Sequence, residues 1–391
     1  MGKNSDANNL PVILIFSRYY LPGFRAGGPV RSVANLVDAL KDKFQIKIVC
    51  SSIDHGSASP YPGIHTNQWQ KINGVDVYYA PAIKVSSSFY EKIYTHVKPD
   101  VIYLNSFFDR WYSMMPVLKF KNKKTPIVLA PRGEFSEGAL QQKRLSKRIY
   151  LMVVKILGFY SNVCWHASSE IEKKCLQYKI NPDAEKLFCI SNLPEIKNTK
   201  ESDLKNKDPH RFRIVLPARI SSMKNTATAI RIVNQLKFPV VFDLWGLNED
   251  QKFWQLCQDE INKSPEHIKI TYRGELTHEK LHDVLKTYDV MLMPTLGENF
   301  GHSIVESLAA GLPVVISDRT PWRNLEKTGI GFDLPLNKEA DFVSAISALQ
   351  RMSEPEFHQV RVNCLQFVQK WKNNSSDVEQ YEKLFKGLLN S

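Results

Sequence analysis

The sequence has few cysteines, and they lie far apart. Six cysteines are scattered singly over 391 residues, and no two of them show the spacing of a metal site or a redox pair. This pattern excludes a disulfide framework and a zinc module as organising elements. We expect reduced thiols, several of which act as small core residues within apolar runs.

Long hydrophobic runs are also missing. The longest apolar run near the N-terminus covers residues 10–16, whereas a membrane-spanning helix needs about 20 apolar residues. The run also lacks the basic flank and the cleavage pattern of a signal peptide. We therefore expect a cytoplasmic protein, with peripheral attachment to the inner face of the cell membrane as a further hypothesis.

Acidic residues are scarce in the first half of the chain. Residues 1–190 hold 26 Lys and Arg against 14 Asp and Glu, so this half carries the whole formal net charge of +12. Such an asymmetry indicates an anionic partner for the first half. Nucleic acid is not expected to be this partner, because the sequence has no helix-turn-helix, RNA-binding sheet or zinc module.

The basic residues of the first half cluster at 119–124 and at 143–148. The second cluster opens a basic and strongly apolar helix candidate, residues 143–157. Such a helix can lie on an anionic membrane surface, or it can be a core helix with a solvated basic end. We expect its apolar part to be mostly core, and the two basic clusters to form a surface patch. An anionic membrane surface would fit this patch.

Strand-like and helix-like segments alternate along both halves, which predicts parallel sheets with helices on both faces. Apolar strand-like runs of the first half include residues 12–17, 46–50, 101–104, 127–130 and 163–167, and those of the second half include 214–217, 240–245, 268–272, 290–294 and 313–317. An Asn-Gly turn before residues 75–80 suggests a hairpin. Residues 111–120 and 136–159 are expected to be helical.

Domain boundaries follow from the polar, unpatterned stretch at 196–210, which is expected to be a linker. We expect an N-terminal domain over 1–195 and a C-terminal domain over 211–370. A C-terminal helix over 371–391 should pack back toward the first domain. Ligands bind beyond the carboxyl ends of parallel strands, so loops of both domains are expected to converge on one interdomain cleft.

The most informative motif has two glutamates, Glu298 and Glu306, on either side of Gly301. An apolar strand-like run precedes it and a helical pattern follows. A strand, a glycine loop and a helix N-terminus present backbone N–H groups and the positive end of a helix dipole to an anion. Two carboxylates beside an anion site suit a sugar nucleotide. The alternative, a favourable charge at a helix N-terminus worth about 0.3–1 kcal/mol, explains one glutamate but not the pair.

A second motif, residues 217–225, follows the first strand of the second half and contains Arg219 and Lys224. An arginine binds phosphate with two parallel hydrogen bonds and a lysine binds it as a point charge. Two cations before a helix N-terminus therefore suit a diphosphate. The alternative is a pair of solvated loop cations; the diglutamate loop expected nearby favours the functional interpretation.

These motifs resemble the retaining glycosyltransferases of family 4, which have the GT-B fold. The segments that carry the resemblance are residues 218–225, 274–276 and 298–315 in the second half, and 27–29, 131–134 and 166–170 in the first half. The resemblance implies an α/β protein of GT-B type, with two Rossmann-like, doubly wound domains facing an interdomain cleft.

The resemblance also implies roles for residues of the diglutamate motif. Glu306 would bind the ribose hydroxyls of the nucleotide, and Glu298 would contact hydroxyls of the donor sugar. The backbone at Phe300, Gly301 and His302 would hold the distal phosphate or the sugar.

The remaining donor-side candidates are two cations and two glycines. By the resemblance, Arg219 and Lys224 would neutralise the diphosphate as it departs. Gly28 would allow a ligand to approach the backbone where a Cβ would clash, the alternative being a flexible turn before a helix. Gly246, directly after the 240–245 strand, is a further donor-site candidate.

Five residues of the first half are acceptor-side candidates: Arg25, Asn105, Arg132, Glu134 and His166. For the arginines and Glu134 the alternatives are solvent exposure and a loop salt bridge. Many relatives carry a histidine where this chain has Asn105, which can hydrogen-bond a hydroxyl but cannot titrate. His166 is a candidate for ligand contact, with a core histidine as the alternative.

Together these features predict a retaining glycosyltransferase, of hexosyl or related type, that uses a UDP- or GDP-sugar and a glycan or lipid-linked acceptor. Capsule, O-antigen or exopolysaccharide synthesis would be its setting. No cofactor and no metal are expected, because no DxD motif follows a strand and the cations would serve instead. The alternatives are a catalytically silent sugar-nucleotide-binding partner, and a GT-B epimerase or phosphorylase.

Overall fold

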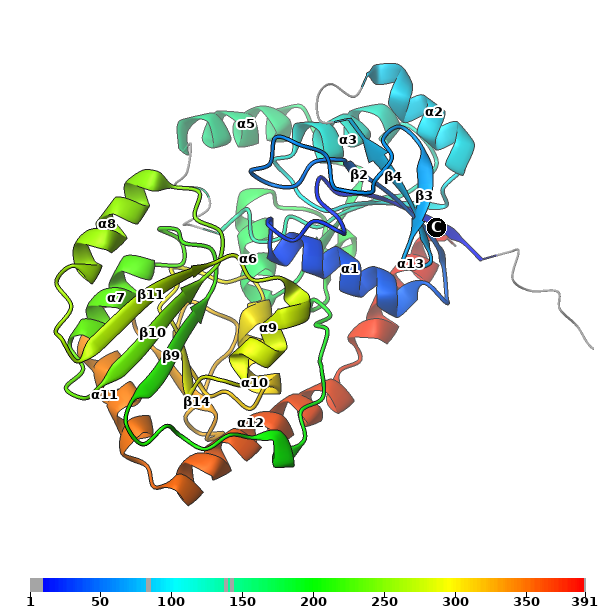
Figure 1. The fold of residues 1–391 in the computed structure, drawn as a ribbon. Coiled ribbons are helices and arrows are strands. Elements are labelled where there is room, and N and C mark those ends of the chain that lie inside the picture. The colour runs from blue at the N-terminus through cyan, green and yellow to red at the C-terminus, as the bar shows by residue number, and fades with distance from the viewer. Residues whose placement is uncertain (1–9, 82–85, 137–139, 141–143, 390–391) are drawn as a thin grey trace, which may run out of the picture. The chain divides into compact units, whose positions relative to one another are not determined.

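The computed structural model describes residues 10–81, 86–136, 140 and 144–389. The chain divides into two compact units. The first unit comprises Met1–Leu193 and Ser376–Ser391, and the second comprises Pro194–Ser375. Each unit is an open, mainly parallel sheet covered by helices on both faces (Figure 1).

The described part of the first unit contains one eight-stranded sheet of order β3-β4-β2-β1-β5-β6-β7-β8. Its elements are β1 (Val12–Phe16), α1 (Gly28–Leu40), β2 (Gln45–Ser51), β3 (Trp69–Ile72), β4 (Val75–Ala80), α2 (Ser87–Val97), β5 (Val101–Leu104), α3 (Met115–Phe120), β6 (Ile127–Leu129), α5 (Arg144–Ile156), β7 (Val163–Ala167), α6 (Glu170–Lys179), β8 (Leu187–Cys189) and α13 (Asp377–Leu389). The predicted hairpin is confirmed: β3 and β4 pair antiparallel around Asn73 and Gly74, both of which have positive φ.

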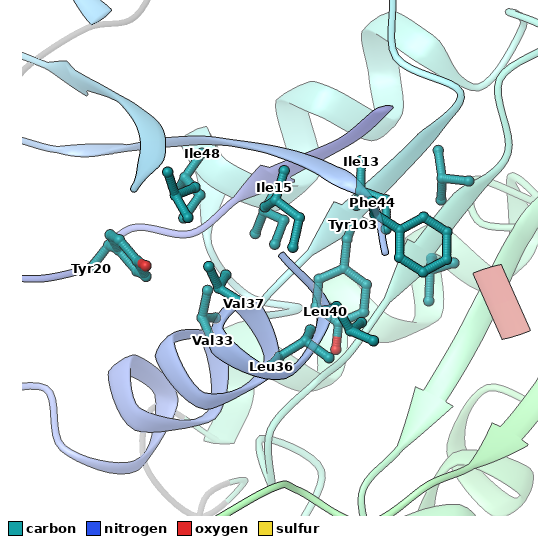
Figure 2. Packing of buried hydrophobic residues seen from close by; sticks show 14 of the residues in the cluster. Ile13, Ile15, Tyr20, Val33, Leu36, Val37, Leu40, Phe44, Ile48 and Tyr103 are labelled. Atoms are coloured by element: carbon teal, nitrogen blue, oxygen red, sulfur yellow. The ribbon is translucent and has the colours of Figure 1, made fainter. Parts of the chain in front are cut away.

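Two cores lie on opposite faces of this sheet, because successive strand residues point to opposite sides. Ile13 and Ile15 of β1 face the core covered by α1, whereas the intervening Leu14 belongs to the core on the other face. Val33 and Val37 of α1 point toward β1 in Figure 2. The helical spacing of these apolar residues is why α1 buries one side, at about 1.5–3 kcal/mol per fully buried aliphatic side chain.

The last helix, α13, packs against α1 and β5 of the first unit. Three of its side chains, Tyr381, Leu384 and Phe385, belong to the same core as α1. The core of the first unit is therefore built from two segments of chain separated by the whole second unit.

The described part of the second unit contains a six-stranded parallel sheet of order β11-β10-β9-β12-β13-β14. Its elements are β9 (Phe212–Pro217), α7 (Thr226–Asn234), β10 (Val240–Trp245), α8 (Gln251–Ile261), β11 (Ile268–Gly274), α9 (His278–Leu285), β12 (Val290–Met293), α10 (His302–Ala309), β13 (Val314–Ser317), β14 (Gly331–Leu334), α11 (Glu339–Arg351) and α12 (Glu354–Asn374). As in the first unit, side chains of β9 alternate between two cores.

The stretch expected to be a linker, residues 196–210, lies within the second unit. Lys197 Nζ donates to the carbonyl of Glu279 (3.0 Å), and Lys207 Nζ donates to the carbonyl of Gln350 (3.0 Å). The polar side chains that made this stretch look like a linker bind backbone carbonyls of the second unit.

Two expected helices differ from the structure. Residues 110–114 form a π-helical turn before α3, and Asp109 Oδ1 accepts hydrogen bonds from the backbone N–H groups of Trp111 (2.9 Å) and Tyr112 (2.8 Å). In the long segment expected over 136–159, the described helix is α5; residues 137–139 and 141–143, including the basic Lys143, lie outside the described residues.

The expectation that the apolar part of α5 is mostly core is wrong. Only Val154 is counted among the buried residues, at 6% exposure. The large apolar side chains that remain exposed are Leu145 (73%), Ile149 (50%), Met152 (57%), Val153 (42%), Ile156 (76%) and Leu157 (68%). The helical period correctly indicated an apolar stripe, but this stripe faces outward.

Candidate functional site

In the second unit β9 and β12 are neighbours in the sheet, although β10 and β11 lie between them in the sequence. The strand order therefore reverses between β9 and β12. Loops leave the carboxyl ends of these neighbouring strands in opposite directions, which creates the place where open α/β sheets bind ligands. Arg219 and Lys224 follow β9, and Glu298 follows β12. The topology therefore brings the two sequence motifs of the second half to one point.

Lys224 and Glu298 contact each other directly, since Lys224 Nζ donates to Glu298 Oε1. The side chains are only 19% and 12% exposed, so water and salt screen their attraction less than at an open surface. Thr295 Oγ1 lies 3.4 Å from the same carboxylate oxygen, and Glu298 N–H donates to the carbonyl of Arg319 (2.9 Å). The pair places one cation and one anion side by side at the strand ends.

The loops that carry this pair are bonded to each other. Asn225 has a left-handed backbone (φ +57°), and its Nδ2 donates to the carbonyl of Pro294 (2.9 Å). Leu296 N–H donates to the carbonyl of Met223 (2.9 Å). Because each loop fixes the other, the position of Lys224 relative to Glu298 is set by backbone contacts as well as by the ion pair.

Gly301 caps the N-terminus of α10 in a left-handed conformation (φ +83°), which favours glycine. A Cβ at this position would lie 2.7 Å from Ile304 Cδ1. The preceding carbonyl, that of Phe300, accepts a hydrogen bond from Trp322 Nε1 (2.5 Å), and the Phe300 ring lies 4.7 Å from the ring of His302. The glycine turn and the buried Trp322 thus fix the backbone at the start of α10.

Glu306 lies in the second turn of α10, and its side chain is 10% exposed. Its Oε1 is 3.4 Å from Nδ1 of His278, the first residue of α9. The other ring nitrogen of His278 is 3.0 Å from Glu195 Oε2. Sequence reasoning did not identify His278, although it closely follows the 274–276 segment that carried part of the family resemblance.

Arg219 lies apart from the Lys224–Glu298 pair, with Nη1 3.6 Å from Glu249 Oε2 and 44% of its side chain exposed. Gly246 (φ +144°) supports its loop, since a Cβ there would lie 2.2 Å from the carbonyl oxygen of Ala218. The carbonyl of Gly246 also accepts a hydrogen bond from Tyr272 Oη (2.9 Å). Gly246 therefore serves the close packing of the β9 and β10 ends in this structure.

The strand order of the first unit reverses in the same way, between β1 and β5. In the loop after β1, the backbone N–H groups of Phe24 (3.0 Å) and Arg25 (3.3 Å) donate to Oδ2 of Asp54, which follows β2. Gly28 is exposed and opens α1, whereas its neighbour Gly27 has the positive φ (+69°). The Arg25 and Gly28 candidates thus lie on an ordered loop at the strand ends.

Three other candidates of the first unit, Asn105, Arg132 and His166, belong to one polar network. Its centre is Arg132, which follows β6. Arg132 Nε donates to Asn105 Oδ1 (2.7 Å), Nη2 donates to Tyr103 Oη (2.7 Å), and Nη1 donates to Asn192. Arg132 also bonds Tyr381 of α13. Asn105 Nδ2 in turn donates to the carbonyl of Pro29 (3.2 Å). These polar groups are satisfied by one another.

His166 is fully buried, and both of its ring nitrogens have partners. Nδ1 lies 2.7 Å from Tyr103 Oη, and Nε2 lies 2.9 Å from the carbonyl of Ile190 and 3.2 Å from Tyr381 Oη. Burial lowers the pKa of His166 to about 3, and the positive charge of Arg132 acts in the same direction. His166 is therefore a neutral core histidine here and is not placed to contact an acceptor.

Glu134 holds the loop after β5. Its Oε1 accepts a hydrogen bond from Ser106 Oγ (2.7 Å), and its Oε2 accepts from the N–H groups of Phe107 (2.6 Å) and Phe108 (2.9 Å). Burial raises the pKa of Glu134 above its ordinary value, while these hydrogen bonds oppose the rise. The carboxylate is used in shaping the loop.

Two further properties concern only the part of the chain that the structure describes. Within it, no group of three or more His, Cys, Asp or Glu side chains is arranged to hold a metal ion. In the same residues, no helix is both long and apolar enough to cross a membrane.

Comparison with known sequences finds a family that matches part of the second unit. Residues 197–360 match the family described as "Glycosyl transferases group 1". This match lies within the second unit and covers less than half of the chain. The matched residues contain β9, β12 and α10, and hence both motifs from which the sugar-nucleotide hypothesis was drawn.

Two individual relatives match different shares of the chain. The "Putative glycosyltransferase EpsF" of Bacillus subtilis (strain 168) is 30% identical over 101 residues, which is 26% of each chain, so the match spans about a quarter of that protein. The "Uncharacterized 41.2 kDa protein in cps region" of Klebsiella pneumoniae is 23% identical over 305 residues, covering 74% of this chain and 79% of that protein.

Solved structures resemble the whole chain. Anabaena HepE, crystallised in complex with UDP and glucose, gives a TM-score of 0.69 at 14% identity, covering 97% of this chain and 99% of that one. At this sequence identity the structural similarity supports the fold only. The chain has the GT-B fold, with two Rossmann-like α/β domains, as the resemblance implied.

Proposed function

We propose that this protein is a retaining glycosyltransferase of family 4 that transfers a hexosyl or related group from a UDP- or GDP-sugar to a glycan or lipid-linked acceptor. The observation that carries the proposal is the contact between Lys224 and Glu298 at the β9 and β12 strand ends, next to the N-terminus of α10. A cation, a carboxylate and a helix N-terminus together match a diphosphate joined to a sugar.

The ion pair suggests how a donor binds. Lys224 and Glu298 neutralise each other in the ligand-free chain. An incoming donor offers a diphosphate to Lys224 and sugar hydroxyls to Glu298, so each partner exchanges the other for a ligand group. Neither charge is left unpaired in a partly buried place, where an unpaired charge is costly.

Charge stabilisation is the main chemical contribution of this site. As the bond between the anomeric carbon and the diphosphate ionises, negative charge grows on the leaving phosphate, and Lys224 and Arg219 stabilise it. The acceptor hydroxyl enters on the same face, and the leaving phosphate takes its proton. The cations make a divalent metal unnecessary, so we propose metal-independent transfer. Glu306 binds the ribose hydroxyls, and the Phe300–His302 backbone holds the distal phosphate or the sugar.

The acceptor side is proposed to lie on the first unit around Arg25 and Gly28, where the β1 loop is ordered. Arg132, Glu134 and His166 are proposed to shape that surface from beneath, because their polar atoms bond within the protein. Asn105 donates to the carbonyl of Pro29 in the first turn of α1 and so connects the two groups. The name of the Klebsiella relative places it in a cps region, which supports capsule, O-antigen or exopolysaccharide synthesis as the setting.

The exposed apolar stripe of α5 supports a membrane surface as a partner. The helix contains no acidic residue, and Lys147, Arg148 and Lys155 accompany the stripe. An amphipathic helix of this composition lies in the headgroup region of an anionic bilayer with its apolar side chains inserted. We propose that α5 holds the protein at the inner face of the cell membrane, where a lipid-linked acceptor would be found.

The catalytic proposal is tested by nucleoside diphosphate release from a panel of UDP- and GDP-sugars, with and without EDTA, in the presence of lipid-linked acceptors. One donor should turn over in both conditions, and the product should keep the anomeric configuration of the donor. Inversion of configuration would overturn the retaining mechanism. Tight binding of a donor without any turnover would instead identify a silent binding partner.

The membrane proposal is tested by flotation with vesicles of neutral lipid alone and of neutral lipid mixed with anionic phospholipid. The wild-type chain should float with the anionic vesicles, and I149D/M152D should lose most of this binding. Leu256, an exposed leucine of α8 in the second unit, provides the matched control L256D, which should float like wild type. Absence of binding to anionic vesicles even at low salt would overturn the proposal.

A further inference from the structure

We infer that His278 is a positioning residue that fixes the Glu306 carboxylate for the ribose, and that the chain crossing from the first unit holds His278 in turn. The inference rests on the proposed function, because it takes Glu306 to bind ribose hydroxyls. Nothing in the family resemblance assigned a role to His278 or to its second partner, Glu195.

Both ring nitrogens of His278 face carboxylate oxygens. Nδ1 of His278 lies 3.4 Å from Glu306 Oε1, and Nε2 lies 3.0 Å from Glu195 Oε2. The His278 side chain is 19% exposed and that of Glu306 is 10% exposed. A neutral imidazole has one N–H, so both contacts are attractive together only when the ring carries a proton on each nitrogen. With a proton on Nδ1, the ring presents one fixed N–H to Glu306.

The contact with His278 fixes the orientation of the Glu306 carboxylate. A carboxylate that accepts a hydrogen bond from a fixed donor on one oxygen keeps its remaining lone pairs in a defined direction. Glu306 is on α10 and cannot shift along it, so the donor on the neighbouring helix α9 selects its rotamer. Preorganised acceptors bind hydroxyl groups better than mobile ones, because less conformational freedom is lost on binding.

The segment that follows the first unit in the chain holds α9 in place. Alternate residues of the crossing segment contact the first turns of this helix: Glu195 contacts His278, Lys197 Nζ donates to the Glu279 carbonyl (3.0 Å), and Thr199 Oγ1 lies 2.9 Å from His282 Nε2. This segment starts where the chain leaves the first unit, at Leu193. Glu195, the first residue of this segment to contact α9, is therefore connected to Glu306 by the side chain of His278 alone.

The test compares the affinities of UDP, 2′-deoxy-UDP and 3′-deoxy-UDP, measured by titration calorimetry, with the GDP series in parallel. Wild type should prefer the ribonucleotide by about tenfold over at least one deoxy analogue, the factor that corresponds to about 1.4 kcal/mol. E306Q should lose this preference. H278A should reduce it to about threefold or less, and H278N, which can place an N–H near the position of Nδ1, should restore most of it.

Two further variants separate positioning from general damage. H282Q changes the other histidine of α9 that contacts the crossing segment, and it should leave the preference unchanged. E195Q should reduce the preference partly, and it keeps the inference testable if H278A does not fold. Thermal melting of each variant controls for folding.

The outcomes are distinct. If H278A weakens the ribonucleotide and both deoxy analogues by the same factor, or weakens none of them, His278 does not position Glu306 and the inference is overturned while the proposed function stands. If wild type itself does not discriminate against either deoxy analogue in either series, the ribose role of Glu306 fails, and the inference fails with it.

Discussion

Polar residues follow the strand ends in both units, but they are used differently. In the second unit, Lys224 and Glu298 are partly exposed and pair with each other across two loops. In the first unit, Asn105, Arg132 and His166 bond to partners deep in the fold. A polar side chain at a strand end can therefore serve a ligand or the fold, and its partners decide which.

This comparison leads to opposite expectations for substitutions. Changes at the strand ends of the second unit should lower transfer while the chain remains folded, because the neighbouring backbone contacts persist. Changes in the Arg132 network should lower the free energy of unfolding first, because they leave buried polar groups without partners. Four substitutions test this difference between the units, in order of decreasing effect.

Lys224→Ala should reduce transfer about 100- to 1000-fold, the usual effect of removing one preorganised group that stabilises a developing anion. The melting temperature should change by only a few degrees. Arg231→Ala is the matched control, since Arg231 is a cation of α7 that pairs with Glu339; it should transfer at the wild-type rate. Steady-state nucleoside diphosphate release measures both, and equal rates for wild type and Lys224→Ala would refute the assigned role.

Arg132→Met should lower the free energy of unfolding by about 3 kcal/mol, because Asn105, Asn192 and Tyr103 each lose a charged donor in a buried place. Urea unfolding gives the value. Arg110→Met removes an exposed arginine that stacks on Trp111 (4.9 Å) and should cost little. If Arg132→Met proves as stable as wild type but inactive, Arg132 belongs with the ligand-facing residues and the contrast between the units breaks.

Tyr381→Phe should cost about 2 kcal/mol of unfolding free energy, since each of the two lost hydrogen bonds typically contributes about 1 kcal/mol. The change removes the hydroxyl that bonds His166 and Arg132 but keeps the ring in the core. Tyr178→Phe, at a site that is 79% exposed, should have no measurable effect on urea unfolding. A loss equal to that of the control would show that α13 is held by apolar packing alone.

Glu134→Gln should change the pH dependence of stability. Burial raises the folded pKa of Glu134 above its ordinary value of 4.5, so the folded state binds this proton more tightly than the unfolded state. The contribution of Glu134 to the free energy of unfolding is therefore present below pH 4.5, and it decreases as pH rises through the pKa of the folded state. Unfolding free energies measured from pH 4 upward should fall less steeply for the variant; identical slopes would contradict the shift.

Much of this architecture could be predicted from the sequence. The apolar runs became strands within a residue or two, as with β1 and β2, because buried parallel strands are short continuous apolar segments. The glycine loop before α10 and the closeness of Lys224 to Glu298 also followed, since a strand, a loop and a helix are local features and parallel strands end at one edge.

The remaining features depend on contacts between distant parts of the chain. Nothing local to His166 indicates that Tyr381 will bond it, or that Asn192 will accept from Arg132. The period of α5 predicts an apolar stripe but not what covers it. His278 was missed for the same reason, because its significance comes from Glu195 and Glu306 rather than from its neighbours in sequence.

The interrupted first unit also has a consequence for the order in which the chain can fold. Synthesis completes every described strand of the first sheet by residue 189, yet Tyr381, Leu384 and Phe385 of its core are made about 190 residues later. The second unit, Pro194–Ser375, is continuous and can close its own core before α13 leaves the ribosome, since domains generally fold as units during synthesis. The unit that is made first is thus the one that is finished last.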